Sequence, residues 1–216
     1  TIMIHHTLTL LRITYKKLKE KLTVSDSKKL FHEKFPFVIP GIYKRIVDEM
    51  LVELNLLNHQ NEFNQDSFFC YGITETFKEL TKGYKPEDHL DILFDSLCSA
   101  TNFDSNKIKQ IHENFKTEIK DKGLEDISNL LKQKSNSNFY PSRILNLGVY
   151  LIISSANDFK KIKDSEKTKI ISDSFKSLNL STAKAEKDIG IYESSIKKLA
   201  QAKELLEEIK LKDKKK

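Results

Sequence analysis

The segment from Ile42 to Leu57 carries the clearest pattern of apolar and polar positions in the chain. Ten of its sixteen residues are apolar, and they recur three and four positions apart. A wide stripe of this period predicts a buried α-helix that is held mainly by packing. The charged residues fall on the opposite side, where Lys44 with Asp48 and Arg45 with Glu49 are spaced i,i+4 as ion pairs. The helix therefore has one charged face left for solvent or a partner.

The same helical period recurs along the rest of the chain. Thr23 followed by Asp26 predicts a capping box at the start of a first helix. Further apolar stripes predict helices that start at Asp66 or Ser67, Pro86, Asp104 or Ser105, Leu124, Pro141, Asp164 and Ser181. No segment alternates apolar and polar residues between hairpin turns. The predicted fold class is therefore all-α: a single helical bundle-like domain of about eight or nine helices with a long amphipathic C-terminal helix.

The predicted helix that follows Pro141 is the most hydrophobic one. Its apolar residues occur all round the helix, which is typical of a helix in the middle of a bundle. The richest run, Ile144 to Ile153, is too short to cross a bilayer. Gly148 lies within it and costs about 1 kcal/mol relative to alanine. We therefore expect a close helix crossing at Gly148.

The chain divides into three parts by pattern. Residues 1–22 form a basic N-terminal extension that we expect to lie outside the fold, and residues 23–181 form the helical core. Residues 182–216 form a long amphipathic or coiled-coil-like helix with a Lys-rich tail. The apolar seam that a coiled coil requires is interrupted at Lys203. We therefore favour packing of this helix against its own domain, or its projection as an amphipathic helix, over a homodimeric coiled coil.

The net charge of +6 at pH 7 is concentrated at the two ends of the 216-residue chain. Between Arg12 and Leu22, and again between Lys210 and Lys216, five basic residues stand against one acid, and the body is nearly neutral. Basic tails suit weak attraction to an anionic membrane surface, and a solvated tail without a partner is an equal alternative. Specific nucleic-acid binding is not expected, because arginine is scarce and most phenylalanines lie on inward stripes.

The two cysteines, Cys70 and Cys98, each sit in an apolar helical pattern. Free buried thiols in a reducing compartment are the expected state, and a disulfide framework is not. The first twenty residues lack the long apolar core of a secretory signal. They are basic and nearly free of acidic residues, as transit peptides are, but short for one.

Motifs for catalysis and cofactor binding were not found in the sequence. Two histidines, His32 and His112, begin only the first half of a zinc-protease pattern, and we interpret His112 as a residue at the boundary of its helix stripe. Six glycines in the whole chain provide no P-loop, no dinucleotide fingerprint and no nucleophile elbow. The prediction is a protein that is not an enzyme, with no catalytic, cofactor-binding or metal-binding residues.

The acidic residues Asp48, Glu49 and Glu53 have a helical spacing that could offer carboxylates to a metal. Carboxylate metal bundles use Glu-x-x-His pairs that face inward, whereas these acids oppose the apolar stripe. We therefore interpret them as a solvated charged face. The same interpretation applies to Asp88, Asp91 and Asp95.

Several sequence blocks occur in the order found in a known family: VSDSKKLF, IYKRIVDEMLVELNLL, TKGYKPEDH, LFDSLC, SRILNLGVYLI and NLSTAKAEKDIGIYESSIKKL. With these blocks, the chain from Thr23 onward resembles the thylakoid formation protein family, also called the photosystem II biogenesis family, of cyanobacteria and plastids. The segment before Thr23 has no counterpart in the family. It also makes no convincing plastid transit peptide, which favours a cyanobacterial host over a plastid.

The resemblance implies an all-helical, non-enzymatic protein that is peripheral on the cytoplasmic or stromal side of the thylakoid membrane. It implies a role in thylakoid organisation and in photosystem II assembly and repair, through contact with the membrane-bound FtsH protease complex. No catalytic or ligand-binding residue carries over from the family. The alternative is a helical binding protein whose basic tails contact nucleic acid or an anionic membrane without a protease partner.

Two surfaces are candidates for the predicted protein contact. One is the last helix with its Lys tail. The other is the charged face of the central helix, formed by Lys44, Arg45, Asp48 and Glu49.

Overall fold

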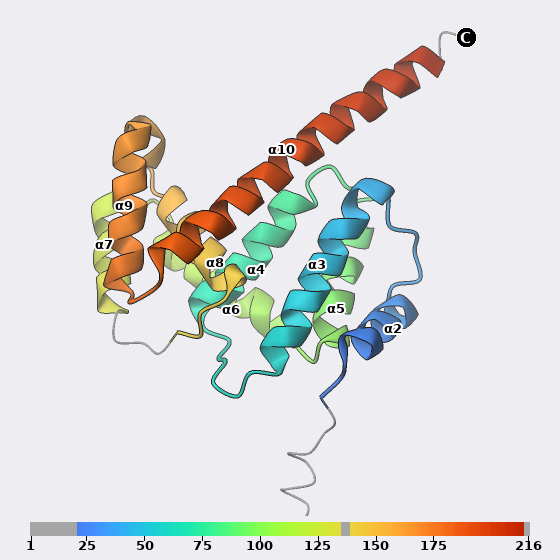
Figure 1. Cartoon of the computed structure of the whole chain (residues 1–216), viewed down its shortest axis with the longest axis horizontal. Coiled ribbons are helices and arrows are strands. Elements are labelled where there is room, and N and C mark those ends of the chain that lie inside the picture. The colour runs from blue at the N-terminus through green and yellow to red at the C-terminus, as the bar shows by residue number, and fades with distance from the viewer. Residues whose placement is uncertain (1–20, 135–138, 214–216) are drawn as a thin grey trace, which may run out of the picture.

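The computed structural model describes residues 21–134 and 139–213, which fold as helices without a strand (Figure 1). The α-helices are α2 (Val24–Lys34), α3 (Gly41–Asn58), α4 (Ser67–Leu80), α5 (His89–Ala100), α6 (Ser105–Ile119), α7 (Leu124–Gln133), α8 (Arg143–Ser154), α9 (Asp164–Ser177) and α10 (Thr182–Asp213), and a 3₁₀ turn η1 spans Phe159–Lys161. The predicted all-α fold class is confirmed. Residues 1–20 lie outside the described ranges, so the role expected for the N-terminal extension stays a prediction.

Side-chain caps fix several helix starts where the sequence predicts them. Before α2, the Asp26 N–H donates to Thr23 Oγ1 over 3.1 Å, and the Thr23 N–H donates to Asp26 Oδ2 over 3.0 Å. This reciprocal pair is the predicted capping box. The side chains of Asp66, Asp104 and Ser142 likewise accept from backbone N–H groups of α4, α6 and α8. Local polar residues therefore determine where these helices begin.

Two predicted starts are displaced in the structure. The helix expected at Pro86 begins at His89, because residues 86–88 form a turn first. Asp164 is the first residue of α9 and makes no cap, so it acts only as a negative charge in the first turn.

The helices α4 and α8 make the closest crossing between two elements. A Cβ added to Gly72 of α4 would lie 2.4 Å from the carbonyl oxygen of Ile144, and one added to Gly148 of α8 would lie 2.3 Å from that of Phe68. Real Cβ atoms do not approach backbone oxygens this closely, so the two helix backbones are in direct contact. The close crossing expected at Gly148 is confirmed, and Gly72 is its partner.

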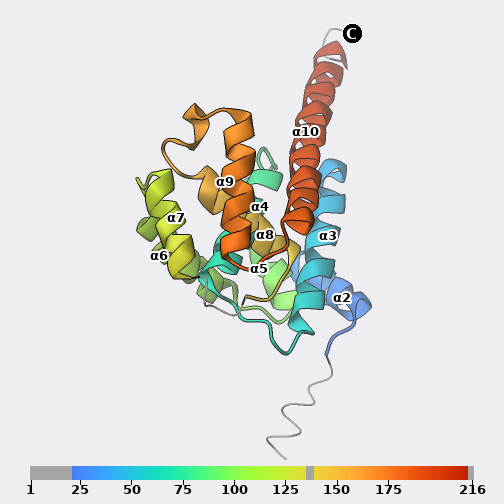
Figure 2. The same ribbon diagram turned by 60° about the vertical axis from the view of Figure 1, so that its left-hand side comes forward.

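The other helices are arranged around this pair. In Figures 1 and 2, α2, α3 and α5 lie on one side of α4 and α8, and α7 and α9 lie on the other, while α6 contacts both α4 and α5. Element contacts agree, since α2 packs on α3 and α5, α6 on α4, and α7 on α9. The large side chains that are fully buried between them include Tyr43, Leu51, Leu54, Phe68, Phe69, Ile73, Leu93, Leu97, Ile108, Ile127 and Phe175.

The 32-residue helix α10 packs on the domain with its first part and projects beyond it with its last part (Figure 1). In the packed part, buried Asn146 of α8 donates to Asp188 of α10 over 2.8 Å. Lys203, near the end of that part, donates to the carbonyl of Lys82. Beyond it, the side chains of Leu205, Leu206, Ile209 and Leu211 are 41–60% exposed. Among the described helices, none combines the length and the apolar character needed to span a membrane.

We expect Gly148→Ala to destabilise the protein, because the added methyl group meets the Phe68 carbonyl and forces α4 and α8 apart. Overpacking of this kind costs about 1–3 kcal/mol in the free energy of unfolding. Urea unfolding followed by circular dichroism measures it.

The matched control is Gly190→Ala in α10, where an added Cβ meets no atom within 4 Å. This variant should gain up to about 1 kcal/mol from helix propensity. Equal urea concentrations at the midpoint of unfolding for the two variants would contradict the close crossing of α4 and α8.

Candidate functional site

The outer face of α3 carries the four candidate contact residues. Lys44 and Arg45 are exposed, and Asp48 and Glu49 are partly exposed. The opposite face of α3 is buried in the core through Tyr43, Ile46, Val47, Met50, Leu51, Leu54 and Leu57. The structure therefore brings the four predicted residues together on one accessible surface, which we call the α3 face.

One of the two predicted i,i+4 ion pairs forms on the α3 face. Arg45 Nε lies 2.8 Å from Glu49 Oε1, as the spacing predicts. The predicted pair between Lys44 and Asp48 is wrong, because Asp48 faces Lys28 of the neighbouring helix α2 at 3.5 Å. Lys44 has no ion-pair partner among the described residues. The α3 face thus presents one unpaired cation beside a paired arginine.

The interpretation of Glu53 as part of a solvated face is wrong. Its side chain is only 15% exposed, and Glu53 Oε2 lies 2.7 Å from Arg143 Nε. The backbone N–H of Ile144 donates to Glu53 Oε1 over 3.0 Å, so one carboxylate covers the first turn of α8. Burial raises the pKa of Glu53, and the Arg143 guanidinium opposes that rise. Glu53 is therefore a structural link between α3 and α8.

A groove of about 610 Å³ continues from the α3 face. Its walls come from α3, from the segment that leads into α8, and from Lys184 in the first turn of α10. Val52, Leu56 and Tyr140 give it an apolar floor, and Leu56 is 53% exposed. Asp48 and Glu49 line the end next to the exposed cations. This groove was not predicted. Val52 and Leu56, two apolar residues outside the buried stripe of α3, were a signal for it in the sequence.

His112 is buried and does not lie at a boundary, so its sequence interpretation is wrong. Its side chain is 1% exposed, with Nε2 at 2.6 Å from Glu75 Oε1 and Nδ1 at 3.0 Å from Glu113 Oε1. The Tyr71 ring stacks on it at 5.5 Å between centroids. The His112 hydrogen bond, followed by the nearby Lys78 ammonium, lowers the pKa of Glu75 to about 2. This contact joins α4 to α6.

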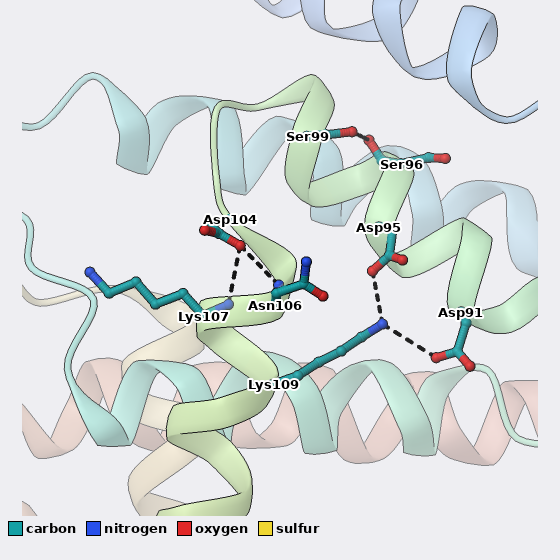
Figure 3. A network of polar contacts seen from close by, with 8 residues as sticks. All are labelled: Asp91, Asp95, Ser96, Ser99, Asp104, Asn106, Lys107 and Lys109. Carbon is teal, nitrogen blue, oxygen red and sulfur yellow. Dashed lines mark hydrogen bonds and ion pairs between the residues drawn. The ribbon is translucent and has the colours of Figure 1, made fainter.

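Figure 3 shows a further polar link, which joins α5 to α6. The Lys109 ammonium lies 2.8 Å from Asp95 Oδ1 and 3.4 Å from Asp91 Oδ1. The Asp91 side chain is 90% exposed and that of Asp95 is 47% exposed. These acids lie on the solvent side of α5, as predicted, and their pairing with Lys109 is weak because water screens it.

Both cysteines are free and buried, as predicted. Burial raises the pKa of the Cys70 thiol and of the Cys98 thiol to about 12. A thiol at such a pKa is protonated at neutral pH and is a poor nucleophile. Among the residues that the structure describes, no group of three or more His, Cys, Asp or Glu side chains has the geometry to hold a metal ion.

The described part of the chain is thus an all-helical domain with a charged helix face beside an apolar groove. The chain belongs to the thylakoid formation protein family, whose model matches residues 23–216. This family is linked to thylakoid formation and photosystem II biogenesis.

Two relatives and one solved structure agree with this assignment. The chain is 72% identical over 198 residues to Protein Thf1 of Prochlorococcus marinus subsp. pastoris (strain CCMP1986 / NIES-2087 / MED4), covering 92% of this chain and 98% of that protein. It is 35% identical over 192 residues to Protein Thf1 of Synechococcus sp. (strain CC9605), covering 86% and 87%. A solved structure of Psb29 superposes with a TM-score of 0.71 at 25% identity and covers 82% of this chain and 98% of that chain.

The lowered pKa of Glu75 predicts a loss of stability in acid. A carboxyl whose pKa is lower in the folded state stabilises the fold above its unfolded pKa of about 4.5, and loses that contribution as pH falls toward 2. Glu75→Gln should therefore lower the free energy of unfolding by up to about 3 kcal/mol at pH 7, and by progressively less below pH 4.5. Urea unfolding at several pH values measures this difference.

Glu113→Gln is the matched control, since Glu113 contacts the same histidine but its side chain is 67% exposed. An exposed pair of this kind contributes less than about 1 kcal/mol. If the Glu75→Gln difference stayed constant from pH 7 to pH 3, the assignment of the stabilising charge to Glu75 would be wrong.

Proposed function

We propose that this protein is a non-enzymatic factor for photosystem II assembly and repair that acts by contact with the membrane-bound FtsH protease complex. Family membership supports the broader role in thylakoid formation and photosystem II biogenesis. The contact with the FtsH protease is the part of this proposal that goes beyond that broader role.

The α3 face is the proposed contact surface, and the observation that carries this choice is its position beside the groove. A mixed charged rim with an apolar floor is the usual composition of a protein interface. Here Asp48 and Glu49 line the groove, and Val52 and Leu56 lie on its floor. Lys44 and Arg45 are exposed one helical turn before the two acids. Because the inner side of α3 is buried in the core, only its outer side is accessible to a partner.

The membrane contact is proposed to be peripheral and on the cytoplasmic or stromal side. The sequence from Lys210 to Lys216 holds five lysines and one acid. Each lysine near an anionic bilayer contributes about 1 kcal/mol of attraction, which salt weakens. The tail would hold the protein near the membrane while the α3 face contacts the protease.

The test exchanges the charges of one pair on the α3 face, as Arg45→Glu with Glu49→Arg. The exchange keeps an i,i+4 ion pair on the helix, so α3 should still fold, although it removes the carboxylate that lies 3.9 Å from Arg143. We expect the tagged variant to recover FtsH subunits from gently solubilised thylakoids at least tenfold less well than the unchanged protein. Mass spectrometry of the retained proteins measures the recovery.

The matched control exchanges an exposed pair on α9, as Asp173→Lys with Lys176→Asp, which lie 3.7 Å apart and outside the groove. This variant should recover FtsH subunits normally. If the α3 variant keeps its fold by circular dichroism and still recovers FtsH subunits in full, the α3 face is not the contact surface. Failure of the unchanged protein to retain FtsH would refute the protease partner.

A further inference from the structure

A second groove, of about 480 Å³, lies between α4, α8 and α10. None of its lining residues belongs to α3, so it is separate from the α3 face. Three tyrosines and three glutamates dominate its wall, and we call it the tyrosine–glutamate groove: Tyr71, Glu75, Glu79, Tyr150, Tyr192 and Glu193.

The charge of this groove is unbalanced. Glu75 is engaged by His112 and by Lys78, which donates to it over 3.1 Å. Glu79 and Glu193 are exposed carboxylates with no cation within ion-pair distance among the described residues. Lys160 is the one cation among the residues that line the groove. The wall therefore carries an excess of negative charge that a bound cation would neutralise.

Tyr192 is a second, independent sign of a ligand. Its side chain is only 5% exposed and lines the groove, yet its hydroxyl makes no hydrogen bond to any residue that the structure describes. Burial raises the pKa of Tyr192, and the charges of Glu79, Glu75 and Glu193 raise it further. The hydroxyl thus stays protonated among carboxylates, with its oxygen free to accept. The Tyr192 oxygen is not itself enclosed, so it opens onto the groove, where it can accept from a ligand or from water.

The aromatic rings fit the same kind of ligand. Tyr150 and Tyr192 meet edge to face at 6.4 Å between centroids, and the Tyr150 hydroxyl donates to Glu193 over 2.9 Å. Tyrosine faces attract cations, and carboxylates with a hydroxyl oxygen accept the several N–H donors of an ammonium or guanidinium group. The groove is larger than a bare metal ion needs, and the carboxylates do not converge as metal ligands.

We propose that the tyrosine–glutamate groove binds an organic cation, a guanidinium or primary ammonium group. The group is either a basic side chain of a protein segment or a free polyamine. Glu79 and Glu193 supply the charge, the Tyr192 hydroxyl accepts one N–H, and the tyrosine rings cover the alkyl part.

The test titrates the full chain with two probes, spermidine and the capped peptide acetyl-Gly-Arg-Gly-amide, and follows binding by calorimetry and by NMR shifts of the Tyr192 ring. Acetyl-Gly-Gln-Gly-amide is the uncharged control probe. We expect saturable binding of a cationic probe, and a dissociation constant at least tenfold higher in the double variant Glu79→Gln with Glu193→Gln. Tyr192→Phe, which removes only the hydroxyl, should weaken binding about threefold.

The control protein is Glu207→Gln with Glu208→Gln, which removes two exposed charges from the projecting end of the same helix. Binding that survives in this control and is lost in the groove variant supports the site. Tighter binding of the peptide then identifies a basic protein segment, and tighter binding of spermidine a free polyamine. No saturable binding, or equal weakening in both double variants, overturns the proposal.

Discussion

The direct backbone contact between Gly72 and Gly148 sets the distance between α4 and α8, and the rest of the fold depends on that distance. With no side chain between them, the two helices approach until carbonyl groups limit them. The first turn of α8 then lies against α3, where Glu53 contacts both Arg143 and the Ile144 N–H. α10 crosses the same pair. Both grooves are therefore bounded by elements that this one crossing positions.

The local features of the fold could be predicted from sequence, because they depend on residues a few positions apart. The capping box of Thr23 and Asp26 and the pairing of Arg45 with Glu49 are of this kind. Glu53 and His112 were misread because a helical pattern tells which side of a helix a residue faces, and not what covers that side. The residue that covers Glu53 is Arg143, 90 positions away in the sequence.

Part of the candidate site could likewise be predicted from the local sequence, and part could not. The exposure of Lys44 and Arg45 follows from the stripe of α3 alone, so the α3 face was predictable. The groove beside it was not, because three segments distant in sequence form its walls. The broad role in thylakoid formation came from the ordered sequence blocks of a family, and the family model that matches residues 23–216 supports that role. The proposed contact with a partner leaves no motif of fixed spacing to find in the sequence, so the partner must be identified by experiment.

The most direct test of this account is photo-cross-linking in intact thylakoids, with a photoreactive amino acid in place of Lys44, and in a second protein in place of Asp173. Lys44 is exposed on the α3 face without an ion-pair partner among the described residues, and Asp173 is 59% exposed on α9. We expect a covalent adduct with an FtsH subunit from position 44 and none from position 173. Adducts with FtsH from both positions, or from position 173 alone, or none at all, would contradict it.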